Sequence, residues 1–166
     1  GGIVVRWDGN TTEVIPTETD TVFYGVWGSA KDDIWIVGGN PGAGVDPKND
    51  YILHWDGNAL VKHEIDVPRG AALFKVWGSS ANDVWVTGER GTIYRFNEGS
   101  WSDHSVEIGA SLFTVHGCSA SEIYTVGGQE LFFYDGQTWQ KREVLDITNI
   151  INGVFCGEKE VLIVGM

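Results

Sequence analysis

VWGSSANDVWVTG, residues 76–88, is the stretch that decides the fold, because the chain repeats it. Residues 26–38, VWGSAKDDIWIVG, are a near copy, and weaker copies begin at Val115 and Val154. Counted from Val26, the copies start 50, 39 and 39 residues apart. Self-similarity at this period is typical of propellers, solenoids and other repeat arrays rather than of one irregular core.

A second repeated feature shows how each unit is built. An aromatic residue followed by a glycine-containing turn occurs at residues 6–10, 54–58, 95–100 and 133–137. Such turns between β-rich segments indicate hairpins. In the cleanest copy we expect strands at 73–77, 83–87, 92–96 and 101–107. The apolar runs are about five residues long and rich in β-branched and aromatic residues, too short for helices, so the chain is predicted to be all-β.

Four strands in each unit of about 40 residues is the size of a propeller blade. We therefore predict one β-propeller domain over residues 1–166, with blades at approximately 22–65, 73–107, 111–145 and 150–166 joined with 1–16. The last of these is a blade made from two half blades, which would close a four-bladed ring. The alternatives are a fragment of a larger ring and a homodimer in which half blades of two chains join into eight blades.

Composition limits the classes of partner. With 166 residues, 42% of them apolar, the chain can bury a core as one domain. A net charge of -12 with only 11 lysines and arginines argues against nucleic acid and suits a basic partner. No run of 18 apolar residues occurs, so no membrane insertion is expected.

The motif at 76–88, with Gly91-Thr92-Ile93-Tyr94 and the turn at 135–139, resembles tandem β-propeller repeats of secreted or surface bacterial proteins. The resemblance covers nearly the whole chain. It implies the propeller fold and an extracellular or cell-surface location, but no particular activity. The turn is also similar to the Asp-box of sialidases, although it is one residue shorter.

Two residue types within the repeats need separate treatment. Cys118 and Cys156 fall at adjacent repeat positions of neighbouring blades, and we expect two buried free thiols, with a disulfide as the alternative. Tryptophans recur at equivalent positions, where other copies carry other large side chains, so we expect core packing rather than sugar stacking. These positions are occupied by Trp7, Trp27, Trp35, Trp55, Trp77 and Trp85.

Residues that the repeat does not explain are the candidates for binding. Residues 39–49 are an insertion relative to the next blade, on the face that also carries the connections between blades. Loops on a rigid scaffold often carry function, although a tolerated surface insertion is the alternative. His116 interrupts a Trp/Trp/Phe column and is either a ligand-facing imidazole in the tunnel or a hydrogen-bonded interior side chain. The predicted ligand-binding residues are Asp20, Asp46, Lys48, Asn49, Asp50, Arg69 and His116.

The sequence favours binding over catalysis. It contains no GxSxG motif, no phosphate-binding loop and no compact acid pair, so we predict a protein that is not an enzyme and needs no cofactor or metal. The leading hypothesis is a recognition module for a protein or glycan, hence lectin-like. A structural blade array and a glycan-active enzyme are the alternatives. Paired acidic residues such as Asp32 and Asp33 are explained by turn chemistry, with a calcium site left open.

Overall fold

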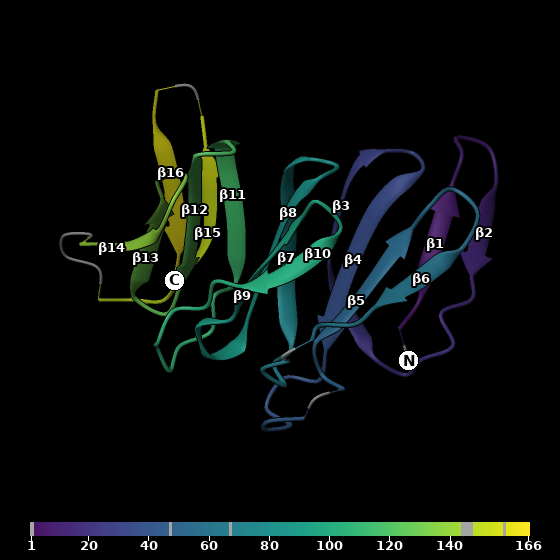
Figure 1. The fold of residues 1–166 in the computed structure, drawn as a ribbon, viewed down its shortest axis with the longest axis horizontal. Coiled ribbons are helices and arrows are strands. Elements are labelled where there is room, and N and C mark those ends of the chain that lie inside the picture. Colours follow the sequence, from purple (N-terminus) through teal and green to yellow (C-terminus); the bar gives the residue numbers. More distant parts are fainter. Residues whose placement is uncertain (1, 47, 67, 144–147, 158) are drawn as a thin grey trace.

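The computed structural model describes residues 2–46, 48–66, 68–143, 148–157 and 159–166. It contains three four-stranded antiparallel sheets in a row, with a two-stranded sheet at each end (Figure 1). The all-β prediction is confirmed at this level. Among the described residues, no helix has the length and hydrophobicity needed to cross a membrane.

We call the four-stranded sheets the first, second and third blades. The first contains β3 (Val22–Ala30), β4 (Asp33–Gly39), β5 (Tyr51–Trp55) and β6 (Leu60–His63). The second contains β7 (Leu73–Ser80), β8 (Asp83–Gly88), β9 (Ile93–Asn97) and β10 (Ser100–Asp103), with a 3-10 turn at Glu89–Gly91. The third contains β11 (Thr114–Ser119), β12 (Glu122–Gly127), β13 (Glu130–Tyr134) and β14 (Trp139–Arg142). Residues 144–145, at the end of the predicted third blade, lie outside the described residues.

The two end sheets are hairpins. The amino-terminal hairpin contains β1 (Val4–Trp7) and β2 (Thr12–Ile15), and the carboxy-terminal hairpin contains β15 (Ile151–Cys156) and β16 (Val161–Gly165). They form separate sheets and lie at opposite ends of the row of blades (Figure 1). The prediction that they join into a fourth blade and close a ring within one chain is therefore wrong for this structure.

The repeated Asp-Gly turns hold the third and fourth strands together. Asp8 Oδ1 accepts hydrogen bonds from the backbone N–H groups of Asn10 and Thr11, at 2.8 and 2.7 Å. Gly9 has a φ of 102°, a left-handed conformation that glycine adopts without strain. Because the backbone donors stabilise the charged carboxylate, they lower the pKa of Asp8 to about 2. The same Asp-Gly turn joins β5 to β6 and β13 to β14.

Neighbouring blades interlock through a tryptophan and a glycine on their first strands. A Cβ on Gly78 would lie 2.4 Å from the Trp27 ring, and a Cβ on Gly117 would lie 2.5 Å from the Trp77 ring. Only a residue without a side chain allows the ring of the preceding blade to approach this closely. The repeated Trp-Gly pair is thus a contact between blades, which explains why both residues recur together.

Burial of the tryptophans agrees with the prediction of core packing in the complete blades but not at the amino-terminal end. Trp35 and Trp85 are fully buried, and Trp55 is 9% exposed. Trp27 and Trp77 are partly buried between blades. Trp7 is 70% exposed, contrary to expectation, because its hairpin lies at the end of the row.

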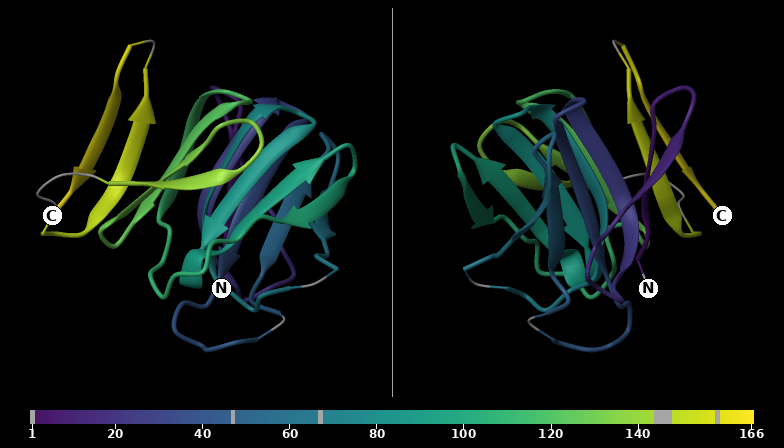
Figure 2. Two further views of the ribbon diagram at one scale, coloured as in Figure 1. Left: turned by 60° about the vertical axis from the view of Figure 1, so that its left-hand side comes forward. Right: turned by 90° about the vertical axis from the view of Figure 1, so that its right-hand side faces the viewer.

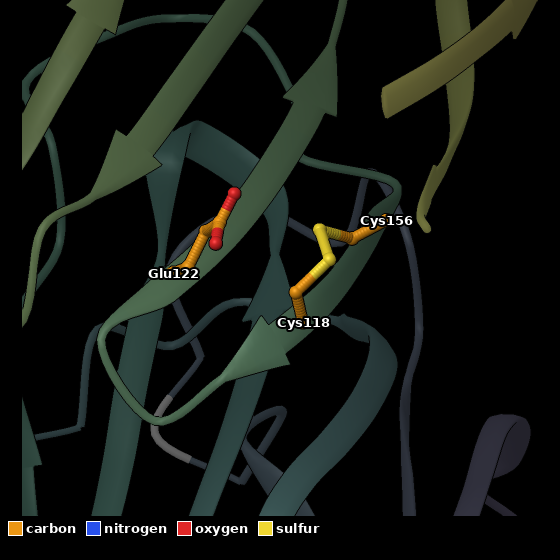
Figure 3. A group of neighbouring side chains, drawn as sticks. All are labelled: Cys118, Glu122 and Cys156. Carbon is orange, nitrogen blue, oxygen red and sulfur yellow. A yellow bond between two sulfur atoms is a disulfide. The ribbon is translucent and has the colours of Figure 1, made fainter. Parts of the chain in front are cut away.

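The cysteines are bonded to each other. A disulfide joins Cys118 at the end of β11 to Cys156 at the end of β15, with their Cα atoms 5.3 Å apart (Figure 3). The expectation of two buried free thiols is wrong, because the two residues at neighbouring repeat positions face each other across adjacent sheets. The Glu122 carboxylate lies within 4.8 Å of both sulfur atoms. Sulfurs in a disulfide are not thiolates, so this group is not a metal site in the oxidised protein.

Candidate functional site

The insertion forms a closed loop between β4 and β5. The side chain of Asn49 bridges its two ends: Oδ1 accepts from the backbone N–H of Asn40 at 2.5 Å, and Nδ2 donates to the Asn40 carbonyl at 3.2 Å. The backbone N–H of Gly42 donates to Glu89 of the second blade at 2.8 Å. Both views in Figure 2 show the loop projecting beyond the strand ends. Its anchors on two blades fix its position.

A hollow of about 430 Å³ lies between this loop and the connection from β2 to β3. Four of the predicted binding residues line it. Two are the carboxylates of Asp20 and Asp46, and the others are Lys48 and Asn49. Asp46 Oδ1 accepts from the backbone N–H of Lys48 at 2.9 Å, which orients its carboxylate. The structure thus brings together side chains from two separate segments of the chain.

A second hollow of about 630 Å³ adjoins the first. It lies between β5, β6 and the segment from β2 to residue 18, and the two hollows share Tyr51 and Lys62. The Lys62 ammonium lies 5.1 Å from the centre of the Tyr51 ring and 2.7 Å from Glu64 Oε1. The two hollows lie next to each other on the outer side of the first blade, and we call them together the outer groove.

Carboxylates outnumber ammonium groups among the described residues that line the outer groove. Glu13, Glu18, Asp20 and Asp46 are acidic, whereas the basic residues are Lys48 and Lys62. Tyr51, Leu53, Trp55 and Leu60 supply apolar surface. A groove with apolar walls and an excess of negative charge suits an extended ligand with basic groups.

Asp50 is part of the framework beneath the loop. It is 7% exposed, and its carboxylate accepts from the Tyr94 hydroxyl at 2.7 Å and from the backbone N–H of Gly70 at 2.5 Å. The Tyr94 hydroxyl also accepts from the backbone N–H of Arg69 at 2.7 Å. These bonds tie the end of the insertion to the second blade. The carboxylate of Asp50 is therefore directed at Gly70 and Tyr94 rather than into the outer groove.

Burial raises the pKa of the Asp50 carboxyl above its ordinary value. Between the unfolded-state pKa and this raised folded-state pKa, the folded protein binds more protons than the unfolded chain. Stability contributed by Asp50 therefore increases as pH falls through that window. We expect the difference in unfolding free energy between the parent and Asp50→Asn to shift in favour of the parent as pH falls from neutral toward 4. Urea unfolding of both proteins at several pH values measures this difference in unfolding free energy. A difference that does not change with pH would contradict the expectation.

Arg69 also lies outside the lining of the outer groove. Its guanidinium donates to the carbonyl of Arg90 at 3.4 Å and lies 3.9 Å from Asp103 and 3.7 Å from Glu107. The Arg90 guanidinium in turn donates to the carbonyl of Gly70 at 2.8 Å. Arg69 therefore contacts the second blade and its connecting turns.

His116 is separate from the other predicted binding residues. Its ring lies between those of Trp77 and Phe155, with centroids 5.9 and 5.0 Å away. Nδ1 accepts from the backbone N–H of Cys156 at 3.0 Å. Burial lowers the pKa of His116, which favours the neutral ring that this bond requires. These contacts match the interior alternative for His116, and they accommodate Cys156 where the other blades have glycine.

Tyr51 and Lys62 were missed as candidates because they lie on ordinary strands of the repeat. Thr19, Thr21 and Asn40 were missed because they carry no charge and follow no pattern. No sequence signal placed Lys62 beside the insertion, because that proximity arises from the packing of the folded chain.

Comparisons with known proteins identify the fold. No protein-family model matches the chain, and a search of curated proteins gives no significant match. Among solved structures, the chain is similar to YCF48 bound to D1 peptide, with 14% identity, a TM-score of 0.62 and coverage of 84% of this chain and 45% of that one. It is also similar to YCF48 from Cyanidioschyzon merolae, with 16% identity, a TM-score of 0.62 and coverage of 87% and 48%. Both are β-propellers. This chain has the β-propeller fold.

The propeller in this chain spans about half the length of the solved structures it matches. At these identities the likeness concerns the fold alone. The sequence-based prediction of propeller blades is thereby confirmed.

Proposed function

We propose that this propeller is a non-catalytic module that binds an extended, basic peptide segment of a partner protein in the outer groove. The observation that carries the proposal is the groove itself, with four carboxylates against two ammonium groups among its described lining residues. An extended peptide fits a long, shallow surface groove better than a compact small molecule does.

Two further observations support a peptide ligand. The aromatic and aliphatic walls offer surface for apolar side chains, and Asp20 and Asp46 lie where a lysine or arginine of the ligand would reach them. One of the similar propellers is described as bound to a peptide, which is a property of that protein and sets a precedent for the fold.

The disulfide supports a proposal about the compartment in which the protein acts. Disulfides persist in oxidising environments such as the extracellular space and the bacterial periplasm. The Cys118–Cys156 bond therefore favours the extracellular or cell-surface location proposed for this propeller. In such a compartment, its ligand would be an exposed or secreted polypeptide.

A fluorescence-anisotropy screen of labelled, unstructured peptides of graded charge tests the proposed function. We expect peptides with several lysines or arginines to bind and acidic peptides of equal length not to bind. In the variant that combines Asp20→Asn with Asp46→Asn, affinity for the best peptide should fall by roughly tenfold, because two attractions to basic groups of the ligand are lost.

A matched control removes two charges from the third blade. Glu122 and Glu143 are exposed there, and the described lining of the outer groove comes from other parts of the chain. Glu122→Gln combined with Glu143→Gln should leave peptide affinity within about twofold of the parent, because it changes net charge alone. Equal losses in the two double variants would contradict the groove as the site, and binding only on a glycan array would favour the lectin-like alternative.

A further inference from the structure

We propose that the protein with its disulfide reduced binds one zinc ion through the side chains of Cys118, Cys156 and Glu122. The three residues lie at the end of β11, the end of β15 and the start of β12, and Figure 3 shows them side by side. One ligand atom from each lies within 4.8 Å of the other two. The metal then replaces the disulfide as the link between the third blade and the carboxy-terminal hairpin. The inference concerns the reduced protein and is independent of the peptide ligand.

The repeat shows that Cys118 and Glu122 are changed as a pair. In the first and second blades, a serine at the end of the first strand donates a hydrogen bond to an aspartate at the start of the second strand. These pairs are Ser29 with Asp33 and Ser79 with Asp83. The third blade has Cys118 at the serine position and Glu122 at the aspartate position. The scaffold already holds these two side chains together, and here they are a sulfur and a carboxylate.

Glu122 differs from its counterparts in the charge that faces it. In the first and second blades, the aspartate contacts a basic residue of the third strand at 2.7 Å. These contacts are Asp33 with His54 and Asp83 with Arg95. The third blade has Phe133 at the position of that basic residue. The Tyr124 hydroxyl donates to Oε1 of Glu122 at 3.2 Å, which orients the carboxylate without neutralising it. Glu122 therefore has negative charge to offer a cation.

Cys156 brings the second sulfur from the neighbouring sheet. The first strands of the second and third blades have Gly78 and Gly117 at this position, each packed against a tryptophan ring of the preceding blade. The counterpart of that tryptophan beside Cys156 is His116, whose Nδ1 accepts from the Cys156 backbone N–H at 3.0 Å. The smaller imidazole ring accommodates a side chain at this position. Two changes in neighbouring repeats thus place Cys156 next to Cys118.

The distances suit a tetrahedral zinc ion. Zinc binds thiolate sulfur at about 2.3 Å and carboxylate oxygen at about 2.0 Å, so two ligand atoms on one ion lie roughly 3.5–3.8 Å apart. The ligand atoms of the three residues are all within 4.8 Å of one another. Rotation about side-chain bonds is therefore enough to close the site once the sulfurs are no longer bonded to each other.

The donor set also selects the metal. Calcium and magnesium take oxygen ligands, whereas thiolates favour zinc and other softer ions. Three protein ligands leave the fourth position of a tetrahedral ion open to water. The carbonyl oxygen of Gly157 lies 3.1 Å from the Cys118 sulfur and is a further donor beside the site. Two thiolates and one carboxylate carry three negative charges, which attract a divalent cation.

Reduction and metal binding are separate steps. A dithiol reductant supplies two electrons and two protons: its own thiols become a disulfide, and the bond between Cys118 and Cys156 becomes two thiols. Zinc then displaces both thiol protons to solvent as two Zn–S bonds form. The carboxylate of Glu122 supplies the third bond. Reoxidation releases the ion, because sulfurs joined to each other are no longer thiolate ligands.

The site is open to the reductant and to the metal ion. Cys118 and Glu122 are exposed. Ser79, the counterpart of Cys118 in the second blade, is also exposed although a complete blade follows it. The exposure of Cys118 therefore belongs to the end of a first strand and recurs from blade to blade. Both reagents reach the sulfur without opening a sheet.

Cobalt titration of the reduced protein tests for the site. The protein is reduced with a dithiol, freed of the reductant by gel filtration without oxygen, and titrated with Co²⁺. The thiolate-to-cobalt charge-transfer absorption should rise to a plateau at one ion per chain, and added Zn²⁺ should abolish it by displacing the cobalt. The oxidised protein should show no such absorption. Absence of the band in the reduced protein, or binding of equal strength by the oxidised protein, overturns the inference.

Substitution of Glu122 tests the third ligand. Glu122→Gln keeps both cysteines, so its fold is checked in the oxidised form by circular dichroism. After reduction, its affinity for Zn²⁺ should be at least about tenfold lower than that of the parent, because one charged ligand is lost. Glu143→Gln is the matched control: it removes an exposed carboxylate beyond the end of β14 and should change the affinity less than about twofold. Equal affinities of Glu122→Gln and the parent would contradict the three-residue site.

Hydrogen exchange tests whether the metal restores the link. In the reduced, metal-free parent, amides of β15 and β16 should exchange faster than in the oxidised parent. Addition of Zn²⁺ should return them close to the oxidised rate, because the ion binds the folded junction. Amides of the second blade report that the rest of the fold is intact. Zinc that binds without slowing exchange in the hairpin would be held by cysteines that have moved apart, which overturns the inference.

Discussion

Replacing Trp85 with alanine is expected to lower the free energy of unfolding by about 3–5 kcal/mol, the range for a buried tryptophan in a core. Trp85 is fully buried on β8, and its ring centre lies 4.7 Å from that of Tyr134 and 5.4 Å from that of Trp139 in the third blade. The Arg95 guanidinium lies 4.9 Å from the same ring. The substitution therefore opens a cavity at the junction of two blades.

Urea unfolding monitored by far-ultraviolet circular dichroism measures the effect of Trp85→Ala. Small domains have total stabilities of about 5–15 kcal/mol, so the variant should unfold at a much lower urea concentration. Trp85→Phe is the matched control: it keeps an aromatic ring against Tyr134 and should lose less than half as much. Equal losses in the two variants would contradict the expectation, because they would mean that a smaller aromatic ring retains none of the packing at the junction.

Removing the disulfide is expected to lower stability by about 2–4 kcal/mol, the usual range for a native disulfide. The bond closes a segment with a sequence separation of 38 and ties the carboxy-terminal hairpin to the third blade. Besides the disulfide, the hairpin is held by a small cluster that contains Val126, Leu131 and Ile151, and by contacts of Phe155 and Cys156 with His116. Cys118→Ser is the cleaner variant, because Cys118 is exposed whereas Cys156 packs against His116.

Hydrogen exchange resolves where the stability is lost. In Cys118→Ser, amides of β15 and β16 should exchange faster, whereas those of the second blade should change little, because a terminal hairpin can open without the rest. A reducing agent should have the same effect on the parent and none on the variant. If reduction leaves the parent unchanged, the disulfide contributes nothing to holding the hairpin.

Much of the fold follows from the repeat. The Trp-Gly pairs, the Asp-Gly turns and the five-residue apolar runs set the strands of each blade, because each feature depends on neighbours within about 40 residues. Tryptophan burial was predicted correctly for Trp35 and Trp85 and incorrectly for Trp7. The difference lies outside the local sequence: whether a repeat position is covered depends on which sheet lies beside it.

The candidate site was predictable only in part. Asp20, Asp46, Lys48 and Asn49 were identified as departures from the repeat, and they line one hollow. Asp50 stands next to them in sequence, but its carboxylate is buried against Tyr94, on a strand 44 residues away. Sequence position alone does not distinguish a carboxylate that lines the groove from one that is buried in the framework. The distinction depends on which hydrogen-bond donor the folded chain brings to each carboxylate.

The sequence by itself determined the all-β fold, the blade as its unit and the equivalence of positions between blades, since these depend on local patterns of apolar residues and turns. Only the tertiary structure decided that the end hairpins lie apart, that Cys118 and Cys156 are bonded, and that the insertion and Lys62 border one groove. These are contacts between segments distant along the chain. Their free energy depends on how whole sheets pack, which no local pattern encodes.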